Sequence, residues 1–120
     1  MTVDGFRFLP KYRLKRPAEF KRVFEARRSA ADGRILVYAA DNGLEFPRLG
    51  LSVSRKVGGA VCRNRWKRLL REAFRLNVAR LPSGYDLVIV PRATYQPVLT
   101  ELQDSLVRLS RNAAKRRPKA

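Results

Sequence analysis

The sequence predicts an α+β fold, a two-layer α-β-β-α-β-α sandwich in which three helices pack against one small sheet. Three segments space their apolar residues as amphipathic helices do, and three shorter segments are rich in β-branched and aromatic residues. Turn sequences such as Asp-Gly and Pro-Ser-Gly lie between these segments. We expect helices over residues 17–29, 60–80 and 97–111, and strands over residues 34–40, 48–54 and 85–90.

The first helix is predicted from a proline followed by an apolar stripe. Pro17 suits a first helical position, and Phe20, Val23 and Phe24 follow it at helical spacing. A turn follows soon afterwards, so we expect this helix to end near Ser29.

The three predicted strands differ in pattern. Residues 34–40 (RILVYAA) and 48–54 (RLGLSVS) are each partly apolar, and we expect them to pair as an antiparallel hairpin. Residues 85–90 (YDLVIV) are more continuously apolar, which indicates a central strand, and Pro91 stops it.

Both ends of the chain are basic. Residues 1–16 indicate an extended basic arm, and residues 112–120 indicate a basic tail. We expect both to be flexible parts of a single domain that spans residues 1–120, because this length suits one modest core.

The charge is the most unusual property of the composition. With 27 Lys and Arg against 10 Asp and Glu, the formal net charge is +17. A folded protein bears such self-repulsion when a polyanion neutralises it, and nucleic acid is the first candidate, ahead of an anionic membrane. His is absent and Cys62 is the single cysteine, which excludes His-dependent catalysis and a zinc site. We therefore predict no catalytic residue and no metal ligand in the protein itself.

The sequence also predicts the compartment. No run approaches the ~18 apolar residues that a membrane span requires, and the N-terminal segment has no apolar signal region. A lone cysteine suits a reducing environment. We expect a cytoplasmic protein with no membrane partner.

The predicted helix from residue 60 has two different sides on a helical wheel. The side expected to pack on the sheet holds Cys62, Trp66, Leu69, Leu70, Ala73 and Leu76. The opposite side holds Asn64, Lys67, Arg68, Arg71 and Arg75, with Arg63 and Arg65 at its two edges.

This basic side is unlike an ordinary solvated face, which mixes Glu with Lys because like charges one turn apart destabilise a helix. From Arg55 to Arg75 there are eight basic residues and one acidic residue, Glu72. Most are Arg, whose planar fork suits bidentate contact with phosphate. We predict that this side binds RNA.

Residues 48–74 resemble the bacterial ribonuclease P protein component. The family's signature combines a strand of the form RxGxSVS, a K-x-G break and a helix with RNRxKRxxRE. The first helix (AEFKRVF), the strand with Tyr38 and the YDLVIV strand resemble the family too. The chain matches the signature with Arg48, Gly50, Ser52-Val53-Ser54, Lys56, Gly58, Arg63-Asn64-Arg65, Lys67-Arg68 and Arg71-Glu72.

The resemblance implies an α-β-β-α-β-α order with a left-handed βαβ crossover, although general experience favours the right-handed form in ~98% of cases. It also implies that a large RNA subunit uses Mg²⁺ to remove the 5′ leader from precursor tRNA, and that the protein binds both RNAs. The residues that we predict to bind the RNA subunit are Arg55, Lys56, Arg63, Asn64, Arg65, Lys67, Arg68, Arg71 and Arg75.

For the single-stranded leader, the resemblance implies a cleft between the sheet and the first helix. Phe20, Phe24 and Tyr38 match the aromatic residues of the family's cleft, and we predict Lys21 and Ser52 as further contacts from their positions beside it. Aromatic stacking on an unpaired base is worth ~1–3 kcal/mol and tolerates varied sequence. Core packing is the alternative for Phe20 and Phe24, and a plain surface position is the alternative for Ser52.

Two other functions stay open from the sequence. A ribosomal-type RNA-binding protein or RNA chaperone would share this layout and charge, but it would not affect tRNA maturation. A stand-alone nuclease would need a carboxylate cluster or a His base, which the sequence lacks.

Overall fold

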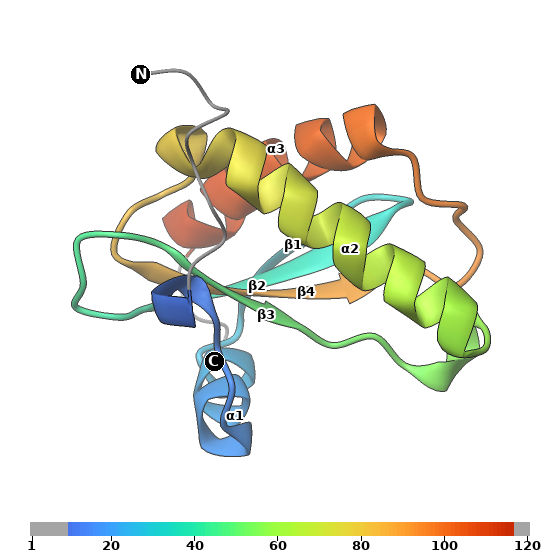
Figure 1. Cartoon of the computed structure of the whole chain (residues 1–120). Coiled ribbons are helices and arrows are strands. Elements are labelled where there is room, and N and C mark those ends of the chain that lie inside the picture. The colour runs from blue at the N-terminus through green and yellow to red at the C-terminus, as the bar shows by residue number, and fades with distance from the viewer. Residues whose placement is uncertain (1–9, 117–120) are drawn as a thin grey trace.

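The computed structural model describes residues 10–116, in which a four-stranded sheet has α2 and α3 on one face and α1 on the other (Figure 1). This arrangement confirms the predicted α+β class. The helices are α1 (Pro17–Glu25), α2 (Ala60–Asn77) and α3 (Leu99–Lys115), with short 3₁₀ turns η2 (Pro10–Tyr12), η3 (Arg55–Val57) and η4 (Val78–Arg80). The strands are β1 (Arg28–Ala31), β2 (Ile35–Asp41), β3 (Arg48–Leu51) and β4 (Tyr85–Pro91).

The strand order is β1-β2-β4-β3, so the predicted hairpin between the second and third strands is wrong. β4 lies between them, antiparallel to β2 and parallel to β3. Leu87, Val88 and Ile89 of β4 are fully buried, and a strand this apolar is stable only with neighbours on both edges and both faces. The predicted central position of this strand is confirmed.

β1 is a strand that the sequence analysis missed, so the observed order is α-β-β-β-α-β-α. The helical pattern was expected to continue to Ser29, but α1 ends at Glu25. Arg27 has a φ of 56°, in the left-handed region, and this residue turns the chain out of the helix and into β1. β1 then pairs antiparallel with β2, with Arg28 opposite Ala39.

The crossover from β3 through α2 to β4 is left-handed, as the resemblance implied. β3 and β4 are parallel neighbours, and both run the same way beneath α2 in Figure 1. The chain returns along α2 above the sheet and then enters β4, which lies next to β3 on the side that makes the crossover left-handed.

Each face of the sheet has its own core. The larger core, under α2 and α3, includes Phe74, Ile35, Leu70, Leu87, Ile89, Leu102 and Leu106, all fully buried. The smaller core, under α1, consists of Leu14, Val23, Ala40 and Val88. α1 is therefore held by fewer apolar contacts than α2 or α3.

The α2 wheel is correct except at its first turn. Trp66 is buried, as predicted, and contacts Tyr95 with ring centroids 5.9 Å apart. Cys62, expected to pack on the sheet, is exposed. The first turn of α2 extends beyond the ends of the strands, so no sheet lies beneath it (Figure 1).

Both ends of the chain were predicted to be flexible, but the inner part of each belongs to the folded domain. Tyr12 and Leu14 are buried, and the Leu14 N–H donates to the Leu49 carbonyl at 2.9 Å. At the other end α3 continues to Lys115, and Ala113 is fully buried. The remainder of the predicted arm and tail, residues 1–9 and 117–120, lies outside the described residues.

Candidate nucleic-acid interface

The outer side of α2 is a cationic surface on a fixed helix. Trp66, Leu70 and Ala73 are buried and anchor the helix to the sheet. As a result the other residues of the predicted set point away from the core. Asn64, Arg65 and Arg68 are exposed, whereas Arg63, Lys67 and Arg71 are half-buried at the sides.

These cations have no neutralising partner. Among residues 10–116, no carboxylate lies within ion-pair distance of Arg63, Arg65, Lys67, Arg68 or Arg71. The Nε atom of Arg63 is buried without any hydrogen-bond partner. A buried charged donor is costly to leave unsatisfied.

Arg75 differs from the other members of the predicted set. Its Nε lies 3.2 Å from both carboxylate oxygens of Glu72, and this hydrogen bonding lowers the pKa of Glu72 below its ordinary value. The structure therefore neutralises Arg75 within the helix instead of presenting it as a free cation.

Arg55 and Lys56 lie in η3, directly before α2, and both are exposed. The Ser54 hydroxyl accepts a hydrogen bond from the Lys56 N–H at 3.3 Å and caps this turn. The turn needs glycine next, because Gly58 has a φ of 136° and a Cβ there would lie 2.9 Å from the Cβ of Cys62. The turn thus places two further cations beside the basic end of α2.

The aromatic residues predicted for the leader occupy the opposite face of the sheet. Phe24 is 37% exposed, and its ring meets that of Tyr38 edge-on with centroids 4.8 Å apart. Phe20 is half-buried and lies over Gly50, where a Cβ would come within 2.9 Å of its ring. The core alternative thus applies partly to Phe20, which packs against the small core, and much less to Phe24.

Lys21 and Ser52 complete the predicted leader set. Lys21 is exposed on α1, beside Phe20 in the sequence. Ser52 is half-buried, and its N–H donates to the Ile89 carbonyl at 3.0 Å, which fixes its backbone to β4.

A groove of about 190 Å³ lies between the two predicted surfaces, beside the outer edge of β3. Phe20 lines it from α1, and Lys67 and Arg71 line it from α2. Arg13, which was not singled out from the sequence, also lines it. Burial, and then the charge of Arg13, lower the pKa of the Arg71 guanidinium. Two cations forced together in this way favour an anion between them.

A buried ionic network fixes α1 on the sheet. The Asp86 carboxylate is fully buried and accepts two hydrogen bonds from Arg48, both at 2.8 Å. Arg22 of α1 reaches the same carboxylate, and Arg48 also contacts Glu19 of α1 at 3.2 Å. The hydrogen bonding to Asp86 raises the pKa of Arg48 despite its partial burial.

The sequence analysis did not identify this network, although one signal for it was present. Asp86 is the only acidic residue in an otherwise apolar strand, and a buried acid requires a cationic partner. Arg22 and Glu19 both belong to α1, so the network fixes the helix that also carries Phe20 and Phe24.

Between residues 10 and 116, no group of three or more Cys, Asp or Glu side chains could hold a metal ion. None of the helices in that range is long and apolar enough to cross a membrane.

Together, the α+β fold and the cationic side of α2 define a class of protein, the small basic α+β proteins whose charged surface suits a nucleic acid. The family model described as Ribonuclease P matches residues 8–114, and the chain belongs to this family. Its function is that of a ribonuclease P protein subunit in tRNA processing.

Curated relatives and solved structures agree with this assignment. The ribonuclease P protein component of Clostridium kluyveri is 40% identical over 105 residues, covering 85% of this chain and 94% of that protein. That of Alkaliphilus oremlandii is 43% identical over 82 residues, covering 68% of this chain and 72% of that protein. The RNase P protein from Thermotoga maritima superimposes with a TM-score of 0.75 at 32% identity, covering 82% of this chain and 96% of that one.

A mutant RNase P protein of Staphylococcus aureus, described as defective in mRNA degradation, superimposes with a TM-score of 0.77 at 32% identity. The superposition covers 87% of this chain and 89% of the Staphylococcus aureus protein.

Proposed function

We propose that the basic side of α2 binds the RNA subunit of ribonuclease P. The observation that carries this proposal is the set of cations on α2 with no carboxylate partner among the described residues. Ion-paired arginines would lose a partner on binding phosphate, whereas Arg65 and Arg68 lose only water. Arg55 and Lys56 extend the same surface beyond the start of the helix.

The leader of precursor tRNA binds on the other side of β3. Phe24 and Tyr38 offer aromatic faces to unpaired bases, and Lys21 offers a cation to the leader backbone. The groove with Phe20, Lys67 and Arg71 supports this arrangement, because it connects the leader surface to the surface for the RNA subunit. One protein would then hold substrate and catalytic RNA together.

In this proposal the RNA subunit performs the hydrolysis with Mg²⁺, which RNA phosphates hold. The protein contributes positive charge, which reduces repulsion between the two RNAs, and stacking surfaces, which position the leader. We place the complex in the cytoplasm, in keeping with the single, exposed and unpaired Cys62.

The decisive experiment compares precursor and mature tRNA binding to the complex reconstituted from this protein and its RNA subunit at low Mg²⁺. We expect tighter binding of the precursor, and Phe24→Ala should reduce this preference. Leu44→Ala is the matched control, because Leu44 is an exposed apolar residue that neither predicted surface includes.

Equal affinity for the two substrates would contradict leader binding. If the protein bound RNA but left tRNA maturation unchanged, the ribosomal-type or chaperone function would replace this proposal. Cleavage by the protein without RNA would contradict the division of roles.

A further inference from the structure

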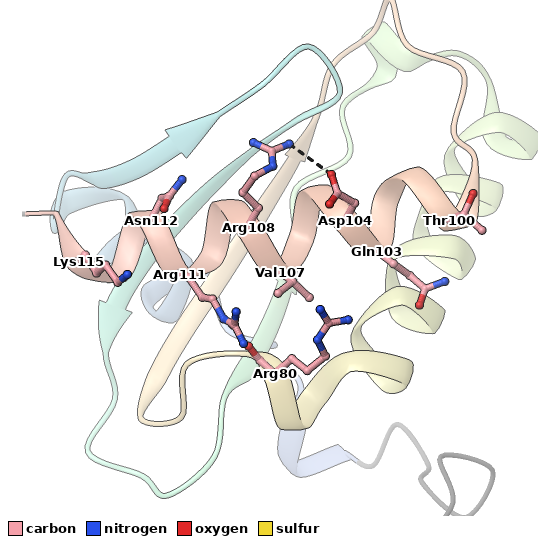
Figure 2. Close-up of a pocket in the computed structure, with 9 residues that line it drawn as sticks. All are labelled: Arg80, Thr100, Gln103, Asp104, Val107, Arg108, Arg111, Asn112 and Lys115. Atoms are coloured by element: carbon pink, nitrogen blue, oxygen red, sulfur yellow. Dashed lines mark hydrogen bonds and ion pairs between the residues drawn. The ribbon is translucent and has the colours of Figure 1, made fainter.

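A third cationic site lies outside both of these surfaces. A groove of about 570 Å³ separates α3 from η4, the turn that follows α2 (Figure 2). Arg80 lines it from η4, and Arg108, Arg111 and Lys115 line it from α3. None of these four residues belongs to the surfaces proposed above for the RNA subunit and for the leader.

The acidic side chain of the groove is already engaged. Asp104 lies 3.8 Å from Arg34 and 3.7 Å from Arg108, and Arg108 also donates to Asp32 at 2.8 Å. In contrast, the part of the chain that the structure describes holds no carboxylate within ion-pair distance of Arg80, Arg111 or Lys115. The groove therefore has a net excess of positive charge.

Two of these arginines are held in place by the protein. The Nε of Arg111 donates to the Arg80 carbonyl at 3.0 Å, and Arg80 Nη1 donates to the Asn77 side-chain oxygen at 3.3 Å. Asn77 is itself buried and donates to the Ala73 carbonyl at 2.8 Å. In Figure 2 the two arginines lie on either side of Val107.

Each anchor uses one N–H of its guanidinium and leaves the others free. A phosphate could therefore bind without first ordering two long side chains, which is the usual entropic cost of such a contact. Thr100 and Asn112 add uncharged polar groups at the rim of the groove.

We propose that this groove binds a phosphodiester segment of the RNA subunit. Arg80 follows the C-terminal end of α2, about 20 Å from Arg65 and Arg68 at 1.5 Å per helical residue. Both sites lie on the face of the sheet that α2 and α3 cover, whereas α1 and the leader residues lie on the other face. An RNA that lies along α2 therefore reaches the groove, and the leader does not. The identity of this RNA rests on the proposed function.

The first test measures how salt affects binding of the purified RNA subunit. The double substitution Arg80→Gln with Arg111→Gln should weaken binding about tenfold and lower the log–log salt slope by about one to two units. Arg92→Gln is the matched control: Arg92 is exposed at the other end of β4, and its Nε is likewise anchored to a carbonyl, that of Asp32. It should leave the slope close to that of the unmodified protein, and circular dichroism verifies that each variant folds.

The second test locates the contact directly. In a Cys62→Ser background, Asn112→Cys carries a tethered iron–EDTA probe at the rim of the groove. We expect it to cleave nucleotides of the RNA subunit different from those cleaved by a probe on Val61→Cys, an exposed position at the start of α2. A rim probe that cleaves no RNA, or a double variant with an unchanged salt slope, would overturn the inference.

Arg65→Ala, measured in parallel, separates this inference from the proposed function. If Arg65→Ala weakens binding while the groove variant does not, the groove inference alone fails. If Arg65→Ala also has no effect, the proposal that α2 binds the RNA subunit fails together with the groove inference.

Discussion

The arginines that join α1 to the sheet and the exposed arginines of α2 have opposite surroundings. Arg48 and Arg22 converge on one buried carboxylate, Asp86, which ties a small helix to the sheet. Arg65 and Arg68 are exposed on a helix that is already fixed by its apolar side, and no described carboxylate faces them. The comparison indicates that paired cations maintain the fold, whereas unpaired cations are available for a ligand. Each substitution below tests one side of this contrast.

The largest expected effect is the loss of the buried acid. Asp86→Ala leaves Arg48 half-buried without its main partner, so we expect the free energy of unfolding to fall by about 3–5 kcal/mol. Asp104→Ala, which removes an exposed acid with ion pairs near 3.7 Å, should cost about 0–1 kcal/mol. Urea denaturation measures both values. Similar losses for the two variants would show that burial of Asp86 does not set its contribution.

The next effect concerns the close contact between α1 and β3. Gly50→Ala places a Cβ 2.9 Å from the Phe20 ring and 3.0 Å from Leu14, so we expect a loss of about 1–3 kcal/mol. Gly33→Ala is the matched control, because a Cβ there meets nothing within 4 Å, and it should change stability by less than about 0.5 kcal/mol. Denaturation measures both. A neutral Gly50→Ala would mean that α1 can shift freely.

A third effect depends on pH. Burial of Asp32 opposes its ionisation, but hydrogen bonds from Ser105, two backbone N–H groups and Arg108 outweigh it and lower its pKa from 3.8 to about 2. Because the folded pKa lies below the unfolded pKa, the stabilisation is present above pH 4 and is lost as the pH falls toward 2. We expect Asp32 to account for about 1–2 kcal/mol of this loss.

Comparing unfolding of the unmodified protein with Asp32→Asn at pH 6 and pH 2.5 measures the contribution of Asp32. The two proteins should differ more at pH 6 than at pH 2.5. An equal difference at both values would contradict the role of the ionised carboxylate.

The smallest expected effect on the fold is at the unpaired cations. Arg68→Ala should leave thermal stability within about 0.5 kcal/mol, yet lower the salt slope for the RNA subunit by about one unit. Replacing Glu72 and Arg75 together by Gln removes a paired, net-neutral couple, so the slope should stay the same. If this neutral replacement lowers the slope as much as Arg68→Ala does, Arg75 contacts RNA as its place on the basic side of the helix predicted.

Local pattern predicted the elements that have a strong apolar signal. β4 is continuously apolar, and α2 and α3 carry buried stripes, so their type and approximate bounds were correct. β1 (RSAA) was missed because its residues are small or polar and it follows a helix with little warning. The hairpin was wrong because strand pairing depends on where β4 inserts, and that is a long-range property.

The candidate site divides in the same way. The basic side of α2 follows from helical spacing. On the opposite side, which was predicted to pack on the sheet, Cys62 is the exception, because it is exposed. The partners of Asp86 could not be predicted, since Arg22 and Arg48 lie 64 and 38 residues away in the sequence. For the same reason, the meeting of Arg13, Phe20 and Arg71 in one groove is visible only in the fold.

The segment before α1 also affects whether another chain can add a strand to the edge of the sheet. β3 is an edge strand, and unpaired backbone groups at such an edge invite strand addition from a neighbouring chain. Leu14 occupies part of that edge through its hydrogen bond to Leu49, and Arg13 forms a parallel bridge to the same residue. At the opposite edge β1 is only four residues long and begins with Arg28. Both edges of the sheet are therefore poor templates for strand addition from another chain.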